Sequence, residues 1–152
     1  FDIQRAELAF TTIIPKLMGA QKTVVSMQVG SEFIPDLPKQ DQMRFRRHTN
    51  FGVGELGEDG YVTDFSWGYQ LSLTSTYAIG AVSLTPGLTF NHGVEGYSSD
   101  DAMQEDARTV GVSLGMAYKQ LSANLSYTTY NDEEYSVVED RDYLSLSTTY
   151  NF

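Results

Sequence analysis

The residues that could carry out covalent chemistry in this sequence are few. The chain has two histidines, His48 and His92, and no cysteine. Neither histidine has a nucleophile motif or a metal-ligand spacing around it. His92 beside Asn91 leaves a hydrolase as a remote alternative. We therefore predict no enzymatic activity, no catalytic residues and no cofactor.

One glycine motif and two acidic clusters invite a binding interpretation. Residues 52–57 match the dinucleotide fingerprint G-x-G-x-x-G, but no buried strand precedes them and no amphipathic helix follows, so we interpret the match as chance. The acidic side chains offer hard oxygen ligands for calcium, although no EF-hand spacing is present. We expect plain surface acidity and no metal site at these residues: Asp100, Asp101, Glu105, Asp106, Asp132, Glu133 and Glu134.

Composition limits the function classes. The 152 residues carry a formal charge of -10, which argues against nucleic-acid binding because phosphates need a basic face. No run of 18 or more apolar residues is present, so a transmembrane helix is excluded. The mean hydropathy of -0.29 would suit a soluble protein, but it also suits a transmembrane β-barrel, whose strands alternate lipid-facing and lumen-facing residues.

Period-two alternation appears in seven segments, each of about 9 to 13 residues, the length that a tilted strand needs to cross a bilayer. In the last segment Leu144, Leu146 and Tyr150 alternate with Ser145, Ser147 and Thr149. The other six segments begin near these residues: Arg5, Val25, Phe65, Val82, Val110 and Leu121.

The connections alternate between tight turns and long polar loops. The long ones are 34–63, 93–108 and 131–140. Short turns and long loops therefore lie on opposite rims, and in outer-membrane barrels the long loops face the outside of the cell. We predict one all-β unit over 1–152, an antiparallel transmembrane β-barrel of about seven meander strands that forms part of a larger barrel.

The soluble alternative is a β-sandwich or a lipocalin-like barrel with the apolar face inside. The opposite face decides against it. Around Ser113 and Ser126 that face carries Gly, Ser, Ala, Asn and Thr without charge, which is poor for a soluble exterior but suits a lumen.

Some residues on the polar face could set the charge preference of a pore. We predict that five of them face the lumen: Arg5, Glu7, Gln28, Glu32 and Gln70. The alternative is that Arg5 and Glu7 form a structural ion pair inside a packed wall. On the loop side, Arg44, Arg46 and Arg47 form a basic cluster that could contact lipopolysaccharide phosphates. A solvated loop neutralised by nearby acids is the simpler alternative for that cluster.

The C-terminal segment 143–152 resembles the sorting signal of bacterial outer-membrane proteins, which ends in an aromatic residue preceded by apolar residues at alternate positions. Leu144, Leu146, Tyr150 and Phe152 fit the pattern, and Thr148 departs from it. The resemblance implies recognition by the barrel-assembly machinery and a location in the outer membrane of Gram-negative bacteria.

Segments 61–69, 84–97 and 140–147, with the elements Trp67-Gly68-Tyr69 and Pro86-x-Leu88-x-x-x-His92, resemble the last third of a family catalogued as domain of unknown function 1302. Its members are longer, so we expect further barrel segments before this one. The family often accompanies transport systems for hydrophobic compounds, which implies periplasmic transport partners and a porin-like role in passing small hydrophobic or amphipathic compounds. The alternative is a non-transporting surface barrel for adhesion or recognition.

Overall fold

The structure is a computed structural model that describes residues 2–39, 42–43, 45, 61–131 and 141–152. Seven β-strands and one short 3-10 turn make up its regular structure. The strands are β1 (Gln4–Pro15), β2 (Lys22–Phe33), β3 (Phe65–Ile79), β4 (Val82–Glu95), β5 (Arg108–Tyr118), β6 (Leu121–Tyr130) and β7 (Tyr143–Tyr150). Among the described residues, no helix has the length and apolar content that crossing a membrane requires.

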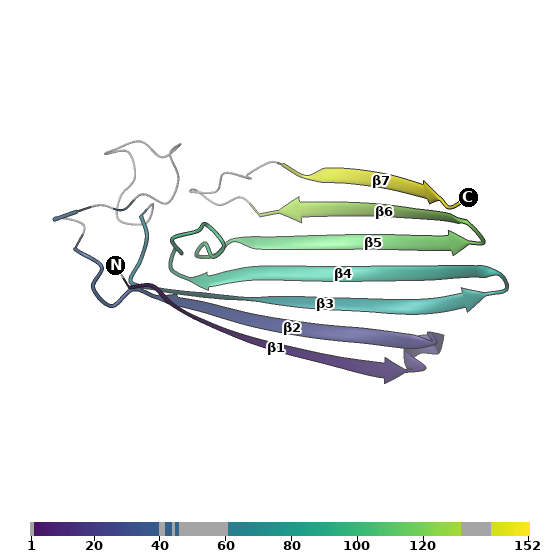
Figure 1. Cartoon of the computed structure of the whole chain (residues 1–152), viewed down its shortest axis with the longest axis horizontal. Coiled ribbons are helices and arrows are strands. Elements are labelled where there is room, and N and C mark those ends of the chain that lie inside the picture. The colour runs from purple at the N-terminus through teal and green to yellow at the C-terminus, as the bar shows by residue number, and fades with distance from the viewer. Residues whose placement is uncertain (1, 40–41, 44, 46–60, 132–140) are drawn as a thin grey trace.

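The strands form one antiparallel sheet in the order β1-β2-β3-β4-β5-β6-β7 (Figure 1), each paired with its neighbour in sequence. This confirms the predicted all-β fold and its meander order. The sheet is open, because β1 and β7 are its two edges and do not pair with one another.

Tight turns and long connections lie at opposite ends of the strands, as Figure 1 shows. The end of the sheet with the tight turns is here called the turn edge, and the opposite end the loop edge. At the turn edge, a 3-10 turn at Leu17–Gly19 joins β1 to β2, a short turn at Gly80 joins β3 to β4, and a short turn at Lys119 joins β5 to β6. At the loop edge, the connections cover 34–64, 96–107 and 131–142. The second of these is shorter than the predicted 93–108 because β4 continues to Glu95.

The register gives the sheet one apolar and one polar face. Because side chains alternate along a strand, residues paired across the sheet share a face. One row of the apolar face is Val25, Leu73, Leu88, Val112, Tyr127 and Leu144. The neighbouring row of the polar face is Ser26, Ser72, Thr89, Gly111 and Thr128.

No second layer covers the apolar face in the described part of the chain. Leu8 is 72% exposed, Leu114 is 46% exposed and Leu144 is 69% exposed. A β-sandwich would bury such residues between two sheets, and Leu114 in particular would lie in its core. Most of the apolar residues that are buried in the described part lie instead at the loop edge, namely Ile34, Tyr61, Val62 and Tyr97, and Ala20 is buried at the turn edge.

Candidate functional site

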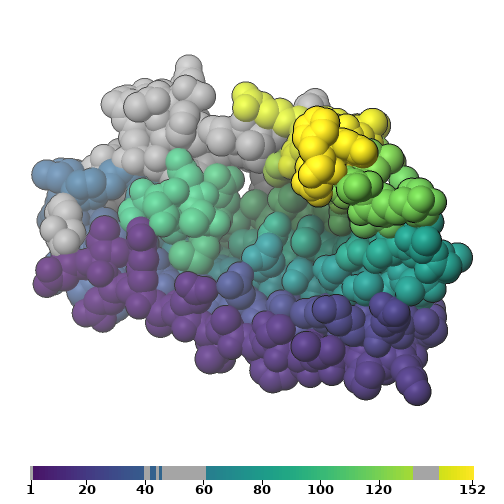
Figure 2. Space-filling model, turned by 45° about the vertical axis from the view of Figure 1, so that its right-hand side comes forward, coloured from purple at the N-terminus to yellow at the C-terminus, as the bar shows by residue number. Residues whose placement is uncertain are grey.

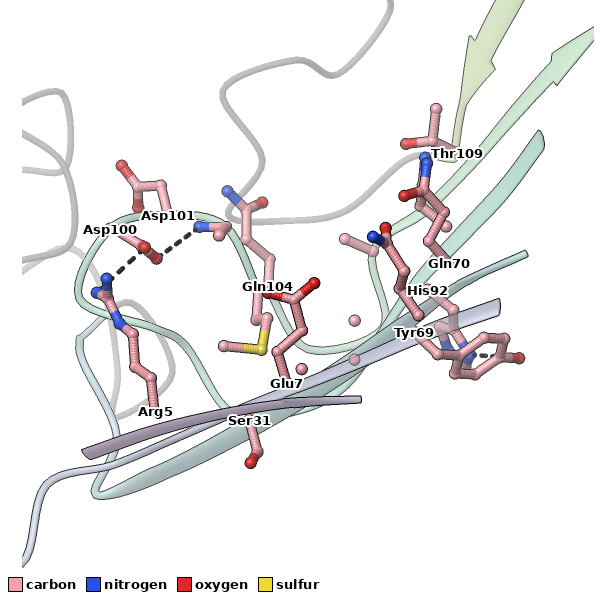
Figure 3. A pocket seen from close by; sticks show the side chains of 18 of the residues that line it. Arg5, Glu7, Ser31, Tyr69, Gln70, His92, Asp100, Asp101, Gln104 and Thr109 are labelled. Atoms are coloured by element: carbon pink, nitrogen blue, oxygen red, sulfur yellow. Dashed lines mark hydrogen bonds and ion pairs between the residues drawn. The ribbon is translucent and has the colours of Figure 1, made fainter. Parts of the chain in front are cut away.

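An open hollow of about 770 Å³ lies on the polar face near the loop edge (Figures 2 and 3). Its floor comes from β1 to β5 and the end of β6, and the 96–107 loop forms one side. In Figure 2 this loop, in green, stands in front of the hollow. We call this space the polar hollow; its lining includes Arg5, Glu7, Gln28, Gln70, Asn91, Thr109, Asp101 and Met103.

Glycines form one row in the floor of the polar hollow, which is open at Gly30, whereas the backbone of Gln104 lies against Gly93. Gly30 pairs with Gly68, and Gly68 pairs with Gly93, so one row across β2, β3 and β4 has no side chains. Glu7 pairs with Gly30 and therefore stands beside this gap. The next row carries the amides of Gln28, Gln70 and Asn91, which are paired strand to strand.

Glu32 joins the sheet to the 96–107 loop. Its side chain is 1% exposed, and its Oε2 lies 2.7 Å from Arg5 Nε, its cross-strand neighbour. The Ser99 N–H donates to Glu32 Oε1 at 2.7 Å, and the Ser99 hydroxyl donates to Oε2 at 3.0 Å. A buried carboxylate is stable only when charge and hydrogen bonds compensate for lost hydration, and these contacts supply both.

Arg5 extends the same network to the loop. Its Nη2 lies 3.1 Å from Asp100 Oδ2, the contact drawn in Figure 3, and donates to Ser99 Oγ at 3.2 Å. We call Arg5, Glu32, Ser99 and Asp100 the latch. It fixes the middle of the loop after β4 to the first two strands, so the loop crosses the polar face instead of extending from the loop edge.

Asp100 is held in its ionised form. Burial alone would raise its pKa, but the Ser98 hydroxyl, the Ala102 N–H and the positive charge of Arg5 together outweigh that effect. The net result is an Asp100 pKa below the ordinary carboxyl value. The Ser98 hydroxyl donates to Asp100 Oδ1 at 2.8 Å. Asp100 therefore stays charged at neutral pH.

The loop has further contacts that shape it. Gly93 N–H donates to Ala107 O at 2.9 Å, and a Cβ on Gly93 would lie only 1.9 Å from Gln104 O. Gly96 has a φ of +73°, which side-chain-bearing residues rarely adopt, and its N–H donates to Glu105 Oε2 at 2.9 Å. Two glycines thus allow the chain to leave β4 and turn back over the sheet.

The structure brings the five predicted polar-face residues to one region. Arg5, Glu7, Gln28 and Gln70 line the polar hollow, whereas Glu32 is buried at its edge. The structural ion pair considered for Arg5 and Glu7 is not formed; Arg5 pairs with Glu32 and Asp100 instead. Sequence reasoning missed Ser99, Asn91 and Thr109. Asn91 and Thr109 are paired on the face of Gln70, so period-two alternation could have found them.

His92 is among the residues that line the polar hollow, but its side chain belongs to the apolar face. Its ring lies 5.4 Å from that of Tyr69 and its Nε2 lies 3.4 Å from Arg108 Nε. In the described part of the chain, no group of three or more His, Cys, Asp or Glu residues could hold a metal ion. Several candidates lie outside the described residues: Arg44, Arg46, Arg47, His48, 52–57, Asp132, Glu133 and Glu134.

The residues of the C-terminal pattern lie along one face of β7. Leu144 pairs with Tyr127 and Leu146 pairs with Leu125, so both belong to the apolar face. Tyr150 pairs with Leu121 at the turn edge, and its ring contacts that of Phe152 edge-on at 5.3 Å. Phe152 is fully exposed and extends beyond the strand.

The family model described as "Protein of unknown function (DUF1302)" matches residues 1–152, the whole chain. The chain belongs to this family. No curated protein and no solved structure gives a significant match to it. The polar hollow and the latch together provide one ion-paired anchor, the carboxylates of Glu7 and Asp101, and a set of amides and hydroxyls suited to binding a polar group.

Proposed function

We propose that this DUF1302 chain forms part of the wall of an outer-membrane β-barrel that passes small hydrophobic or amphipathic compounds. The observation that carries the proposal is the pairing of an uncovered apolar face with a polar, hollowed face across a single sheet. A wall between lipid and a wet passage needs these two faces on opposite sides of the same strands.

The apolar face supports contact with hydrocarbon. Its central rows carry no charged side chain, and they hold Val25, Leu73, Leu88, Val112, Leu114, Leu125, Leu144 and Leu146. Leu88, Leu114 and Leu125 are 44% to 47% exposed even in the middle of the sheet. Apolar area removed from water is favourable by about 25 cal/mol per Å², so a bilayer would stabilise this face along its full width.

The open edges support a larger barrel. β1 and β7 each leave one row of backbone N–H and C=O groups without a strand partner in the described chain. In hydrocarbon each such group costs several kcal/mol, so spanning sheets close on themselves. Bacterial single-chain barrels have an even number of strands, and seven strands therefore require at least one more to close the wall.

The proposed orientation follows from the connections at the two ends of the strands, which are short at the turn edge and long at the loop edge. Short turns would face the periplasm and the long connections the cell exterior. Tyr150 and Phe152 would then lie at the periplasmic interface, where aromatic rings are favoured, and would present the terminal pattern to the barrel-assembly machinery. The basic residues Arg44, Arg46 and Arg47 would lie on the side of lipopolysaccharide.

A non-transporting surface barrel is the second candidate, and the latch favours it. Because Glu32 and Arg5 fix the 96–107 loop across the polar face, that loop narrows whatever passage lies there. A loop that sealed the lumen would leave the barrel as an anchor for the exposed connections, which would then serve adhesion or recognition.

Solute flux separates the two candidates. The full-length protein is reconstituted in phosphatidylcholine vesicles, and uptake of small amphipathic solutes is compared with uptake by protein-free vesicles. Transport predicts flux above the protein-free rate, and an anchor predicts no flux. Thiol labelling tests the two faces of the sheet in either case: a cysteine placed at Ser113 should react with an aqueous thiol reagent, whereas one placed at Leu114 should not. Labelling at Leu114 alone would contradict the membrane proposal itself.

A further inference from the structure

The charged side chains that line the polar hollow do not balance one another. Arg5 is the positive member, and Glu7, Asp100 and Asp101 are the negative ones. Arg5 is already engaged, since it lies 2.7 Å from Glu32 and 3.1 Å from Asp100. The hollow therefore offers a bound solute an acidic lining in which the positive charge is occupied.

Glu7 is the carboxylate best placed to meet a solute. It lies on β1 two residues beyond Arg5, it is exposed to the hollow, and no ion pair engages it among the described residues. Figure 3 shows its side chain rising from the strand toward the centre of the hollow, away from the Arg5–Asp100 contact. A cation bound there would not have to displace an existing partner.

The surroundings of Glu7 have space for a ligand and both kinds of contact surface. Gly30, its cross-strand neighbour, has no atom within 4 Å of the position that a Cβ would occupy. The amides of Gln28 and Gln70 follow on one side. From the loop, Ala102 and Met103 add apolar surface to the same hollow.

From these observations we propose that the polar hollow is a binding subsite for amphipathic cations, in which Glu7 engages an ammonium or similar group and the gap at Gly30 admits the group to it. This inference rests on the proposed transport function, which supplies the route by which a solute reaches the polar face. It adds to that function a substrate class: singly charged cations with a short apolar body are favoured over anions of the same body.

The test uses two probes that share a six-carbon chain and cannot cross lipid unaided, hexyltrimethylammonium and hexanesulfonate. Their flux is measured with the full-length protein in phosphatidylcholine vesicles, and their binding is measured by calorimetry in nanodiscs of the same lipid. The wild-type protein should favour the cation by roughly fivefold or more, as expected for one carboxylate acting in a partly screened site.

Three variants separate the roles of the residues. Glu7→Gln keeps the shape of the side chain and should bring the cation-to-anion ratio close to one. Gly30→Leu should fill the gap and weaken cation binding with Glu7 still present. Glu95→Gln removes the same charge from an exposed residue that pairs with Trp67 outside the hollow, and should leave the ratio unchanged.

The outcomes distinguish this inference from the transport proposal. Equal flux of both probes, or a ratio that Glu7→Gln does not change, would overturn the subsite and leave transport standing. Absence of flux together with calorimetric binding that Glu7→Gln abolishes would overturn transport and retain the subsite. Preference for hexanesulfonate would overturn the inference outright.

Discussion

The two halves of the sheet have the same alternation but different polar faces. In β1 to β4 the polar face carries Arg5, Glu7 and Glu32, and the 96–107 loop lies against it. In β5 to β7 the polar face is uncharged, with Gly111, Ser113, Ser126 and Ser145 among its residues. The apolar face shows no such division. Charge is therefore concentrated where a loop is anchored, and the rest of the polar face is left small and open.

This difference separates two physical requirements. The first requirement applies to the whole sheet: apolar and polar residues alternate along each strand, so that one face is apolar and the other is polar. The latch satisfies a local requirement, since a loop that crosses a polar face loses backbone entropy that its contacts must offset. Glu32 meets that requirement with one buried carboxylate shared between Arg5 and Ser99.

The largest effect is expected in the second half, where only the face of a residue should matter. Leu114→Arg would place a cation on the proposed lipid face at a cost of roughly 2 to 4 kcal/mol, whereas Ser113→Arg would place it on the polar face beside Gly87. We expect Leu114→Arg to reduce the amount of assembled full-length protein in outer-membrane fractions far more than Ser113→Arg does. The reverse order would make the apolar face an interior core.

In the first half, Glu32→Ala should release the loop while sparing the strands. Removing one partner of a fully buried ion pair costs roughly 3 to 5 kcal/mol, but Arg5 is 52% exposed and can regain water, so we expect about 2 kcal/mol. Hydrogen exchange in 96–107 should rise by roughly thirtyfold, since about 1.4 kcal/mol corresponds to tenfold. Ser126→Ala in the second half is the matched control. Faster exchange throughout the sheet would contradict a role confined to the latch.

Gly30 and Gly93, which lie in one row and both pair with Gly68 between them, sharpen the comparison within the first half. Gly93→Ala would place a Cβ 1.9 Å from Gln104 O, so the loop must shift, at a cost of about 1 to 2 kcal/mol. Gly30→Ala meets nothing within 4 Å and should be nearly neutral. Faster proteolysis of the loop in Gly93→Ala alone is the expected result. Equal proteolysis of the two variants would mean that the loop does not depend on this close approach.

The alternation was sufficient to predict the strands because the polarity of each side chain indicates which face of the sheet it lies on. The seven segments, their order and the shared face of Arg5, Glu7, Gln28 and Gln70 all follow from period two and from short turns between neighbours. The same alternation placed the charged residues Arg5, Glu7 and Glu32 on the polar face. The pattern does not show whether other strands close the sheet.

The latch could not be predicted in the same way. Ser99 and Glu32 are 67 residues apart, and Ser99 belongs to a loop with no periodic pattern. Its conformation depends on Gly93, on the positive φ of Gly96 and on the hydrogen bonds of Ser98. A usable signal was the presence of Glu32 beside Arg5 on the polar face of neighbouring strands, because a carboxylate taken out of water there requires a partner.

The smallest effect is expected from Asp100, the more exposed of the two latch carboxylates at 44%, and it depends on pH. The folded protein holds the Asp100 pKa below its ordinary value, with hydrogen bonds and Arg5 outweighing burial. A carboxyl with a lowered folded pKa stabilises the fold above its unfolded pKa, and this contribution disappears as the pH falls through the folded pKa. Asp100→Asn should therefore loosen the loop at pH 7 by about 0.2 to 1 kcal/mol, the range of exposed ion pairs. Below about pH 4, where the ordinary carboxyl titrates, the difference should shrink. The ratio of hydrogen exchange in 96–107 between variant and wild type, taken at each pH, removes the intrinsic effect of pH on exchange. A ratio that stayed constant from neutral to acidic pH would show that the side-chain hydrogen bonds of Asp100, and not its charge, hold this end of the loop to Arg5.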